Sequence, residues 1–163
     1  MIFGNRASYG GGVVAELISD PIIRNCTVYG NEGTIAAGGL YAYRGSEPTL
    51  INTIVAHSKE GEAVTCVNQS TATLICSDIY GNVGGDYVGC IREQYGVNGN
   101  FSADPLFCDA PLGDFTLAAT SPCLPGHHPD GDDCDLVGAL GEGCAGGTAV
   151  EQTSWGGIKS LFR

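Results

Sequence analysis

The sequence is poor in basic residues and in long apolar runs. Seven Lys and Arg residues stand against eighteen Asp and Glu residues, which gives a net charge of −11 at pH 7. A surface of this sign repels phosphate backbones, so nucleic acid is not an expected partner. The chain lacks the run of about eighteen apolar residues that a membrane span needs. Its opening residues also lack the apolar core of a signal peptide, so we expect any export signal to have been lost or removed.

Composition also argues against a helical protein. The chain has 26 glycines but only one Met and one Trp. Glycine is a poor helix former and marks sharp turns, so helix should be scarce. A length of 163 residues is enough for one domain with a core of its own.

Eight cysteines are far more than a reducing compartment usually tolerates. They lack the close two-by-two spacing of a structural zinc site, so disulfides are the expected use. The sequence therefore predicts a secreted protein with an extracellular or cell-surface location.

An internal repeat of about twenty-five residues runs through the first half of the chain. The segment SDPIIRN at residues 19–25 returns as SEPTLIN at residues 46–52. The motif NCTVYGN at residues 25–31 is followed by NTIVAHS at 52–58 and CSDIYGN at 76–82. The opening IFGN at residues 2–5 matches VYGN at 28–31, so the chain begins inside a repeat.

Each repeat contains short apolar or β-branched runs separated by Gly, Asn, Ser and Pro, a pattern typical of strands and turns. A period this short fits one coil of a β-solenoid, in which equivalent strands stack as parallel ladders. The alignment then predicts that Val28, Val55 and Ile79 lie one above another with their side chains in the core.

Asparagine recurs at one turn of the repeat, at Asn5, Asn31 and Asn82. Asparagine tolerates left-handed backbone and can bond its side-chain amide to the equivalent residue one coil away. We therefore predict short asparagine ladders, which Ser58 interrupts at this turn and Cys76 at the other asparagine position.

The motifs GGVV at residues 11–14 and GGLY at 38–41 are each followed by Ser-acid-Pro and by a turn of the VYGN type. In these motifs the chain resembles the bacterial right-handed parallel β-helix repeat family, which includes adhesin-like and polymorphic outer-membrane surface proteins. The resemblance covers residues 2–82. It implies an all-β, right-handed parallel β-helix of a few coils.

Residues 100–117 and the following SPC at 121–123 resemble the closing segment of such helices. We therefore expect a β-helix domain at residues 1–144 with a disulfide-rich C-terminal cap from about residue 100. Residues 145–163 are expected to form a linker and a tail with an apolar spacing around Trp155. That tail is interpreted as a sorting or anchoring element, or as a disordered end or strand-edge cover.

Three cysteine pairs bracket short segments and are candidate local disulfides: Cys66 with Cys76, Cys90 with Cys108, and Cys123 with Cys134. This leaves Cys26 and Cys144, which are expected to stay unpaired or to force a different connectivity.

Residues 127–135 concentrate two histidines and four carboxylates, which offer hard oxygen ligands to calcium. The candidate ligands are Asp130, Asp132, Asp133 and Asp135. The spacing is not that of an EF-hand, and an acidic Pro/Gly loop is also typical of a solvated turn. No other cofactor is predicted.

Three tripeptides match the N-glycosylation pattern, at Asn25, Asn68 and Asn100. The first lies inside the repeat, where asparagine has a turn role, so a structural interpretation is favoured there.

Evidence for catalysis is thin in the sequence. Carbohydrate-active β-helices collect acids and basic residues on one strand face, but none of the five basic residues up to residue 100 recurs in register with a paired carboxylate. These basic residues are Arg6, Arg24, Arg44, Lys59 and Arg92.

The favoured hypothesis is a non-catalytic scaffold or adhesion module, a fragment of a larger surface protein that contacts polysaccharide or other surface proteins. The alternatives are a polysaccharide lyase or glycoside hydrolase and a calcium-dependent glycan-binding module. The N-terminal edge of the first coil lacks a visible cap, so we expect it to pair with an upstream segment or with a second copy of the chain.

Overall fold

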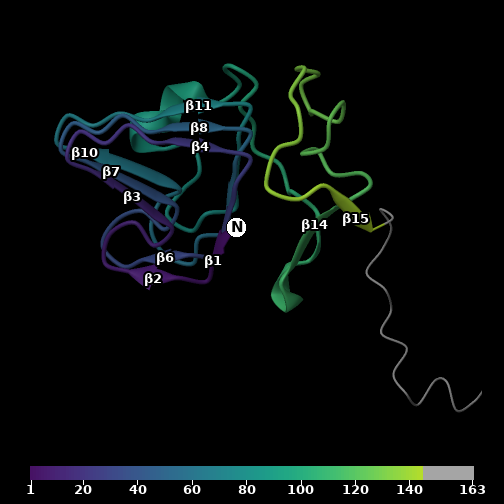
Figure 1. The fold of residues 1–163 in the computed structure, drawn as a ribbon, viewed down its shortest axis with the longest axis horizontal. Helices are drawn as coiled ribbons and strands as arrows, with labels where there is room; N and C mark the ends of the chain where they lie inside the picture. The colour runs from purple at the N-terminus through teal and green to yellow at the C-terminus, as the bar shows by residue number, and fades with distance from the viewer. Residues whose placement is uncertain (145–163) are drawn as a thin grey trace, which may run out of the picture.

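The computed structural model describes residues 1–144, which form a stack of parallel β coils beside a smaller β layer (Figure 1). The predicted linker and tail at residues 145–163 lie outside the described residues. The all-β class is confirmed, since the two helical segments are short 3₁₀ turns, η1 (Gly89–Gln94) and η2 (Ala110–Leu112). None of the helices in the described part is long and apolar enough to cross a membrane.

Short strands make up the rest of the architecture. They are β1 (Ile2–Phe3), β2 (Arg6–Ala7), β3 (Val13–Glu16), β4 (Ile22–Arg24), β5 (Thr27–Tyr29), β6 (Glu32–Gly33), β7 (Leu40–Tyr43), β8 (Thr49–Ile51), β9 (Ile54–Ala56), β10 (Val64–Val67), β11 (Thr73–Ile75), β12 (Asp78–Tyr80), β13 (Phe107–Asp109), β14 (Asp114–Ala118) and β15 (Glu142–Cys144).

Equivalent strands of successive coils stack in parallel, as the repeat predicts. The sheets have the orders β1-β5-β9-β12, β3-β7-β10, β4-β8-β11 and β2-β6 (Figure 1). In the first sheet Val28 pairs with Ile2 on one side and with Val55 on the other, and Val55 pairs in turn with Ile79. The predicted ladder is therefore confirmed, and its three members Val28, Val55 and Ile79 are at most 3% exposed.

Asparagine side chains join the coils at one corner. Asn31 accepts a hydrogen bond from the Asn5 backbone N–H at 2.9 Å and donates to the Ile2 carbonyl at 3.0 Å. Asn82 makes the same two bonds two coils further on, with the Ser58 N–H and the Val55 carbonyl, both at 3.0 Å. The predicted bonding between coils is confirmed.

The backbone at these corners differs from the prediction. The left-handed residue is the glycine before each asparagine, with φ of 60° at Gly30 and 68° at Gly81. The asparagines at the other turn of the repeat adopt that conformation instead, with φ of 47° at Asn25 and 49° at Asn52, and Cys76 follows them at 46°. Cys76 thus keeps the backbone turn, although it has no side-chain amide to continue an asparagine ladder.

The C-terminal end of the stack is closed by residues 81–100. Helix η1 packs against β10 and β11, and its Ile91 is fully buried in the core. The Gln94 amide then replaces a strand partner for β11, because it accepts from the Leu74 N–H and donates to the Ala72 carbonyl, both at 2.8 Å. Asn100 does the same next to it, with the Ser77 N–H at 3.0 Å and the Leu74 carbonyl at 2.8 Å.

The N-terminal end has no such cover among the described residues. Strands β1, β2, β3 and β4 are each the outermost member of their sheet. The inward side chains of Ile2, Val13 and Ile23 pack on the core but stay partly exposed. Association of this edge with an upstream segment or a second copy stays a prediction.

The predicted C-terminal cap begins on the last coil, where Phe101 pairs with Asp78 of β12, and then continues as a layer along the side of the first sheet (Figure 1). The Gly138 N–H donates to the Asn52 carbonyl at 2.8 Å, and the Ala139 N–H donates to the Thr27 hydroxyl at 3.0 Å. Phe115 packs on Phe3 and Tyr29 with ring centroids 5.0 Å apart. We call residues 101–144 the lateral layer.

The predicted cysteine pairings are wrong. The structure joins Cys66 to Cys90, Cys76 to Cys134, and Cys108 to Cys144. Cys123, expected to pair with Cys134, is instead a free, fully buried thiol, and Cys26 is the other free cysteine. The first disulfide closes the terminal coil, and the other two hold the lateral layer to the solenoid and to itself.

Titration of the oxidised protein with a thiol reagent should therefore find two free thiols that differ in reactivity. Cys26 is partly exposed and should react in the native state. Cys123 should react only after denaturation, because burial raises the pKa of its thiol and excludes the reagent. Peptide mapping should show the label at these two positions. Eight reactive thiols in the native protein would contradict the disulfide framework.

Candidate functional site

Tyrosines gather on the outward face of the sheet β3-β7-β10. Side chains alternate between the two faces of a strand, so Leu40 and Ala42 of β7 point into the core while Tyr41 and Tyr43 point outward. The parallel register places Val14 of β3 beside Tyr41. Glu16 of the same strand lies beside Tyr43. The sheet thus presents two aromatic rings next to a carboxylate.

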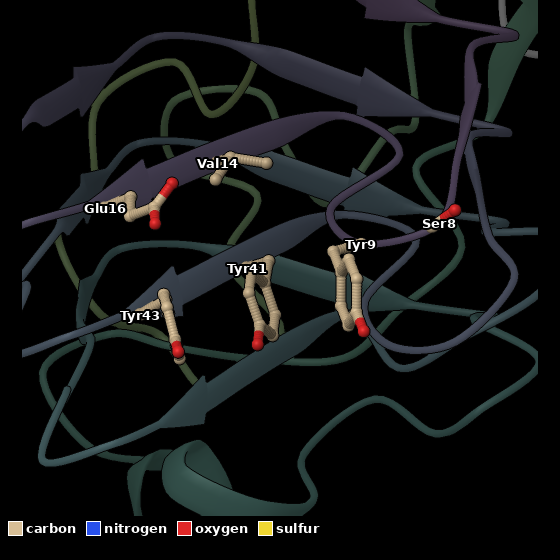
Figure 2. Close-up of a pocket in the computed structure, with 6 residues that line it drawn as sticks. All are labelled: Ser8, Tyr9, Val14, Glu16, Tyr41 and Tyr43. Atoms are coloured by element: carbon tan, nitrogen blue, oxygen red, sulfur yellow. The ribbon is translucent and has the colours of Figure 1, made fainter.

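A third ring joins them from the loop between β2 and β3. Tyr9 lies with its ring centroid 5.3 Å from that of Tyr41, and Tyr41 lies 5.9 Å from Tyr43 with its ring nearly parallel, at 19° (Figure 2). Gly10 makes this approach possible, because it has φ of 47° and a Cβ there would come within 2.6 Å of the Val13 carbonyl and the Val14 side chain. A larger residue at position 10 would push Tyr9 away from the sheet.

Two neighbouring hollows follow this row of rings. The first, of about 510 Å³, is lined by Ser8, Tyr9, Val14, Glu16, Tyr41 and Tyr43 (Figure 2). The second, of about 380 Å³, shares Tyr9 and Tyr41 with the first and reaches Glu62 and Thr65. We call the two hollows together the tyrosine groove. It crosses three coils, since β3, β7 and β10 belong to successive repeats.

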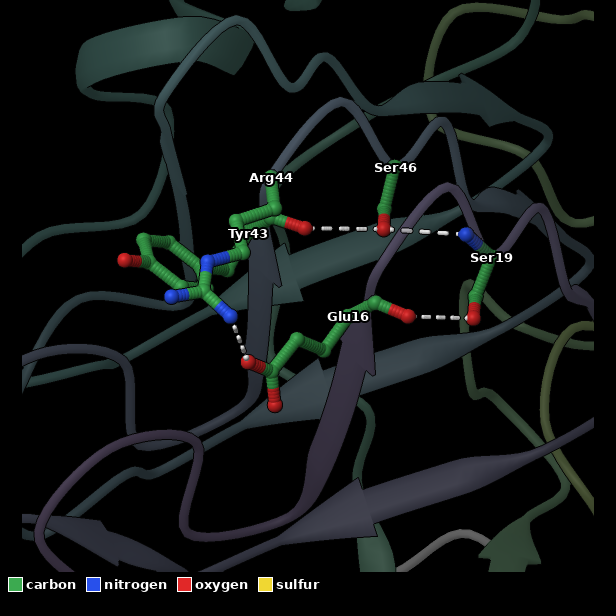
Figure 3. A network of polar contacts seen from close by, with 5 residues as sticks. All are labelled: Glu16, Ser19, Tyr43, Arg44 and Ser46. Carbon is green, nitrogen blue, oxygen red and sulfur yellow. Dashed lines mark hydrogen bonds and ion pairs between the residues drawn. The ribbon is translucent and has the colours of Figure 1, made fainter.

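An ion pair borders the groove. The Arg44 guanidinium lies 3.5 Å from the Glu16 carboxylate, and its central carbon lies 4.9 Å from the centroid of the Tyr43 ring (Figure 3). Near this ion pair, Ser46 donates to the Tyr43 carbonyl at 2.9 Å and accepts from the Ser19 N–H at 3.1 Å. These contacts tie the ends of β3 and β7 together at the border of the groove.

The ion pairs also correct one reading of the sequence. Arg44 pairs with Glu16, and Arg6 pairs with Glu32 at 3.0 Å, so two basic residues do meet carboxylates of a neighbouring coil. Glu16 and Glu62 enter the groove from different coils, and Tyr41 lies on the strand between them.

The environment of Tyr41 is unfavourable for added negative charge. Burial is the largest cause that raises the pKa of its phenol, and the neighbouring Tyr43, Tyr9 and Glu16 raise it further. Tyr41 therefore stays a neutral hydroxyl in the middle of the groove, able to donate a hydrogen bond as well as to offer its ring face.

The predicted calcium loop has a different organisation. The side chains of Asp130, Asp132, Asp133 and Asp135 are all exposed. Within residues 1–144, no three His, Cys, Asp or Glu side chains come together in a group able to hold a metal ion. Calcium binding stays a prediction without support from this geometry.

His128 organises that loop instead. Its Nδ1 accepts from the backbone N–H groups of Asp130 at 3.2 Å and Asp132 at 3.4 Å, and its Nε2 lies 3.1 Å from the Gly99 carbonyl. The ring therefore carries its proton on Nε2 in this arrangement. It also packs edge-on against Phe101, with centroids 4.6 Å apart.

The three glycosylation patterns differ in access. Asn100 is fully buried and its amide is used between coils. Asn25 is exposed but donates to the Leu136 carbonyl at 2.8 Å, in keeping with its predicted turn role. Asn68 is exposed at a left-handed turn after β10.

A further hollow of about 300 Å³ lies between the lateral layer and the solenoid, with Tyr29, His57, Asp104 and Asp109 among its lining. Both carboxylates serve local turns, since Asp104 accepts from the Leu106 N–H and Asp109 from the Leu112 N–H. This hollow is smaller than either part of the tyrosine groove, and its two carboxylates are already used in local turns, so the tyrosine groove is the stronger candidate site.

No protein-family model, curated protein or solved structure matched the chain in comparisons with known proteins. The parallel β-solenoid is shown by the strand pairing, whereas the bacterial family remains a resemblance of motifs. The tyrosine groove is therefore the feature of the described structure from which a function can be inferred.

Proposed function

We propose that the protein is a non-catalytic extracellular adhesion module that binds glycan chains in the tyrosine groove. The observation that carries the proposal is the row of Tyr9, Tyr41 and Tyr43 along the outward face of the parallel sheet β3-β7-β10, with Tyr9 supplied by the adjoining loop. Aromatic faces pack on the apolar faces of sugar rings, while phenol and carboxylate groups bond the sugar hydroxyls. The groove runs across coils and is open, which suits a chain better than a single compact molecule.

Charge narrows the class of glycan. The net charge of −11 and the carboxylates of Glu16 and Glu62 in the groove disfavour acidic polysaccharides. The expected ligand is therefore a glycan without carboxylate or sulfate groups. The three disulfides support an oxidising, extracellular location, and the resemblance to surface β-helix repeats agrees with an adhesive role.

Catalysis is the weaker alternative. Acid–base cleavage of a glycosidic bond needs two carboxyl groups that face the same bond. The first hollow has one carboxylate, Glu16, which pairs with Arg44, and Glu62 lies in the second hollow beyond Tyr41. A calcium-dependent glycan site at Asp130–Asp135 is not supported by a group of three ligand side chains among the residues described.

Replacing Tyr41 with alanine should weaken glycan binding about tenfold, because the central ring contributes about 1.4 kcal/mol of contact. Affinity electrophoresis and titration calorimetry with a panel of soluble neutral polysaccharides would measure the loss. Tyr95→Ala is the matched control, since Tyr95 is 60% exposed, packs on Tyr87 and lies outside the groove. The proposal fails if no glycan of the panel binds, or if Tyr41→Ala binds as tightly as Tyr95→Ala.

A further inference from the structure

The second hollow of the tyrosine groove holds a carboxylate that has no basic partner among residues 1–144. The ion pairs in this part of the chain are Arg6 with Glu32 and Arg44 with Glu16. Glu62 is instead partly buried, and one of its oxygens accepts from the Thr65 hydroxyl at 2.8 Å. This hydrogen bond positions the carboxylate in the hollow, and its second oxygen has no hydrogen bond to any other of the residues that the structure describes.

The other end of the row shows what such a site accommodates. There the Arg44 cation lies over the Tyr43 ring and against the Glu16 carboxylate. A ring face and a carboxylate together stabilise a cation more than either group alone. The negative face of the aromatic ring and the negative charge of the carboxylate both attract the cation. At the second hollow Tyr9 and Tyr41 supply the rings and Glu62 supplies the charge.

The wider surroundings of the second hollow add no competing positive charge. Its other lining residues are Ile35, Ala36, Gly61, Thr65, Val67 and Gly84, all uncharged.

We propose that the second hollow binds a protonated amino group of the glycan, so that the groove selects hexosamine units with free amines over acetylated or neutral units. The inference rests on the proposed glycan-binding function and adds the ligand class. The ammonium would sit against the free oxygen of Glu62 with the sugar ring on Tyr41 and Tyr9. The cost of desolvating the carboxylate is then offset by a direct ion pair.

Calorimetry with three oligosaccharides of equal length would test this. One is a β-linked hexosamine with free amines, the second is its N-acetylated form, and the third is a neutral glucan. The native protein should bind the amine form about fivefold more tightly than the acetylated form, a ratio that corresponds to about 1 kcal/mol. Added salt should reduce this preference.

Glu62→Gln should lose the preference while keeping its fold, since glutamine still accepts from Thr65 through its carbonyl oxygen. Glu142→Gln is the control, because Glu142 is exposed on β15 in the lateral layer and its replacement removes the same charge away from the groove (Figure 1). Equal affinities of the native protein for the amine and acetylated forms would overturn the inference. An equal loss of the preference for the amine form in Glu62→Gln and Glu142→Gln would also overturn it. In those cases binding of the neutral glucan keeps the proposed function, whereas absence of binding to all three sugars removes both.

Discussion

Val55→Asp should not fold. Val55 is 1% exposed and lies between Val28 and Ile79 in the sheet that crosses every coil. Its side chain also faces Gly39, where a Cβ would meet Val55 at 2.5 Å, so the site has no room to rearrange. An unpaired carboxylate in such a place costs several kcal/mol, comparable with the whole stability of a domain of this size, about 5 to 15 kcal/mol.

Far-UV circular dichroism and thermal unfolding would detect this loss. Val83→Asp is the matched control, because Val83 follows β12 at the surface and is 75% exposed. Val55→Ala separates the loss of packing from the burial of a charge, since it removes two methyl groups without adding a carboxylate. It should lower the free energy of unfolding by about 1 to 3 kcal/mol. A cooperative transition of native-like stability in Val55→Asp would contradict the assigned core.

The second large effect concerns pH. Asp78 of β12 is fully buried, with its carboxyl oxygens bonded to the Ala103 N–H at 3.1 Å and to the Cys123 thiol at 3.4 Å. Burial raises its pKa to about 8, the two hydrogen bonds lower it in part, and Asp86 and Asp104 raise it again. The folded protein therefore holds a proton that the unfolded chain, with an ordinary Asp pKa near 3.8, releases much earlier.

Stability should consequently fall as the pH rises between about 4 and about 8, because over this window the native state binds more protons than the unfolded state. The contribution of protonated Asp78 to the free energy of unfolding is complete below the pKa that Asp78 has in the unfolded chain. It is lost as the pH rises through the pKa that Asp78 has in the folded protein. Its slope approaches about 1.4 kcal/mol per pH unit. Urea unfolding of the native protein at several pH values would measure it.

Asp78→Asn should remove this slope, because the asparagine carbonyl can still accept from Ala103 and no longer titrates. The variant should be the more stable protein at pH 8. Asp133→Asn makes the same substitution in an exposed loop and should keep the slope of the native protein. Parallel pH profiles for Asp78→Asn and the native protein would rule out the proposed role of the buried carboxyl.

The solenoid could be predicted from the sequence because its period appears directly in the residues. Val28, Val55 and Ile79 stand at equivalent places of adjacent repeats, and each buried side chain has to be apolar for its coil to close. The lateral layer has no such repeat. Its place along the first sheet depends on contacts between residues far apart in the chain, such as Asn25 with Leu136, which spacing does not encode.

The cysteine pairings illustrate both cases. Cys66 and Cys90 are 24 residues apart, which is one coil, so the repeat itself carried the signal for this bridge. A short separation in sequence was a poorer guide to the other pairings. In a solenoid, two residues one coil apart in the sequence are closer in space than many residues that are only ten positions apart. Cys76 and Cys134, separated by 58 residues, meet only because the lateral layer returns along the stack.

The tyrosine groove also left a signal in the sequence. Leu40, Tyr41, Ala42 and Tyr43 alternate between core and surface residues, which places both tyrosines on one face. The register with β3 then brings Glu16 beside them. Tyr9 could not be predicted in the same way, since its approach to Tyr41 depends on the backbone of a loop and on Gly10.

The disulfides divide the chain into parts that respond differently to mechanical tension. Their loops overlap along residues 66–144, whereas residues 1–65 contain no cross-link. When the chain is pulled, this first part can unwind coil by coil and lengthen by roughly 200 Å, given about 3.3–3.6 Å per extended residue. Most of residues 66–144 cannot extend, because the disulfides enclose them in covalent loops. Since Tyr9, Tyr41 and Tyr43 all lie in the extensible part, strong traction unfolds the tyrosine groove first, and the proposed glycan binding should end while the cross-linked part of the protein stays intact.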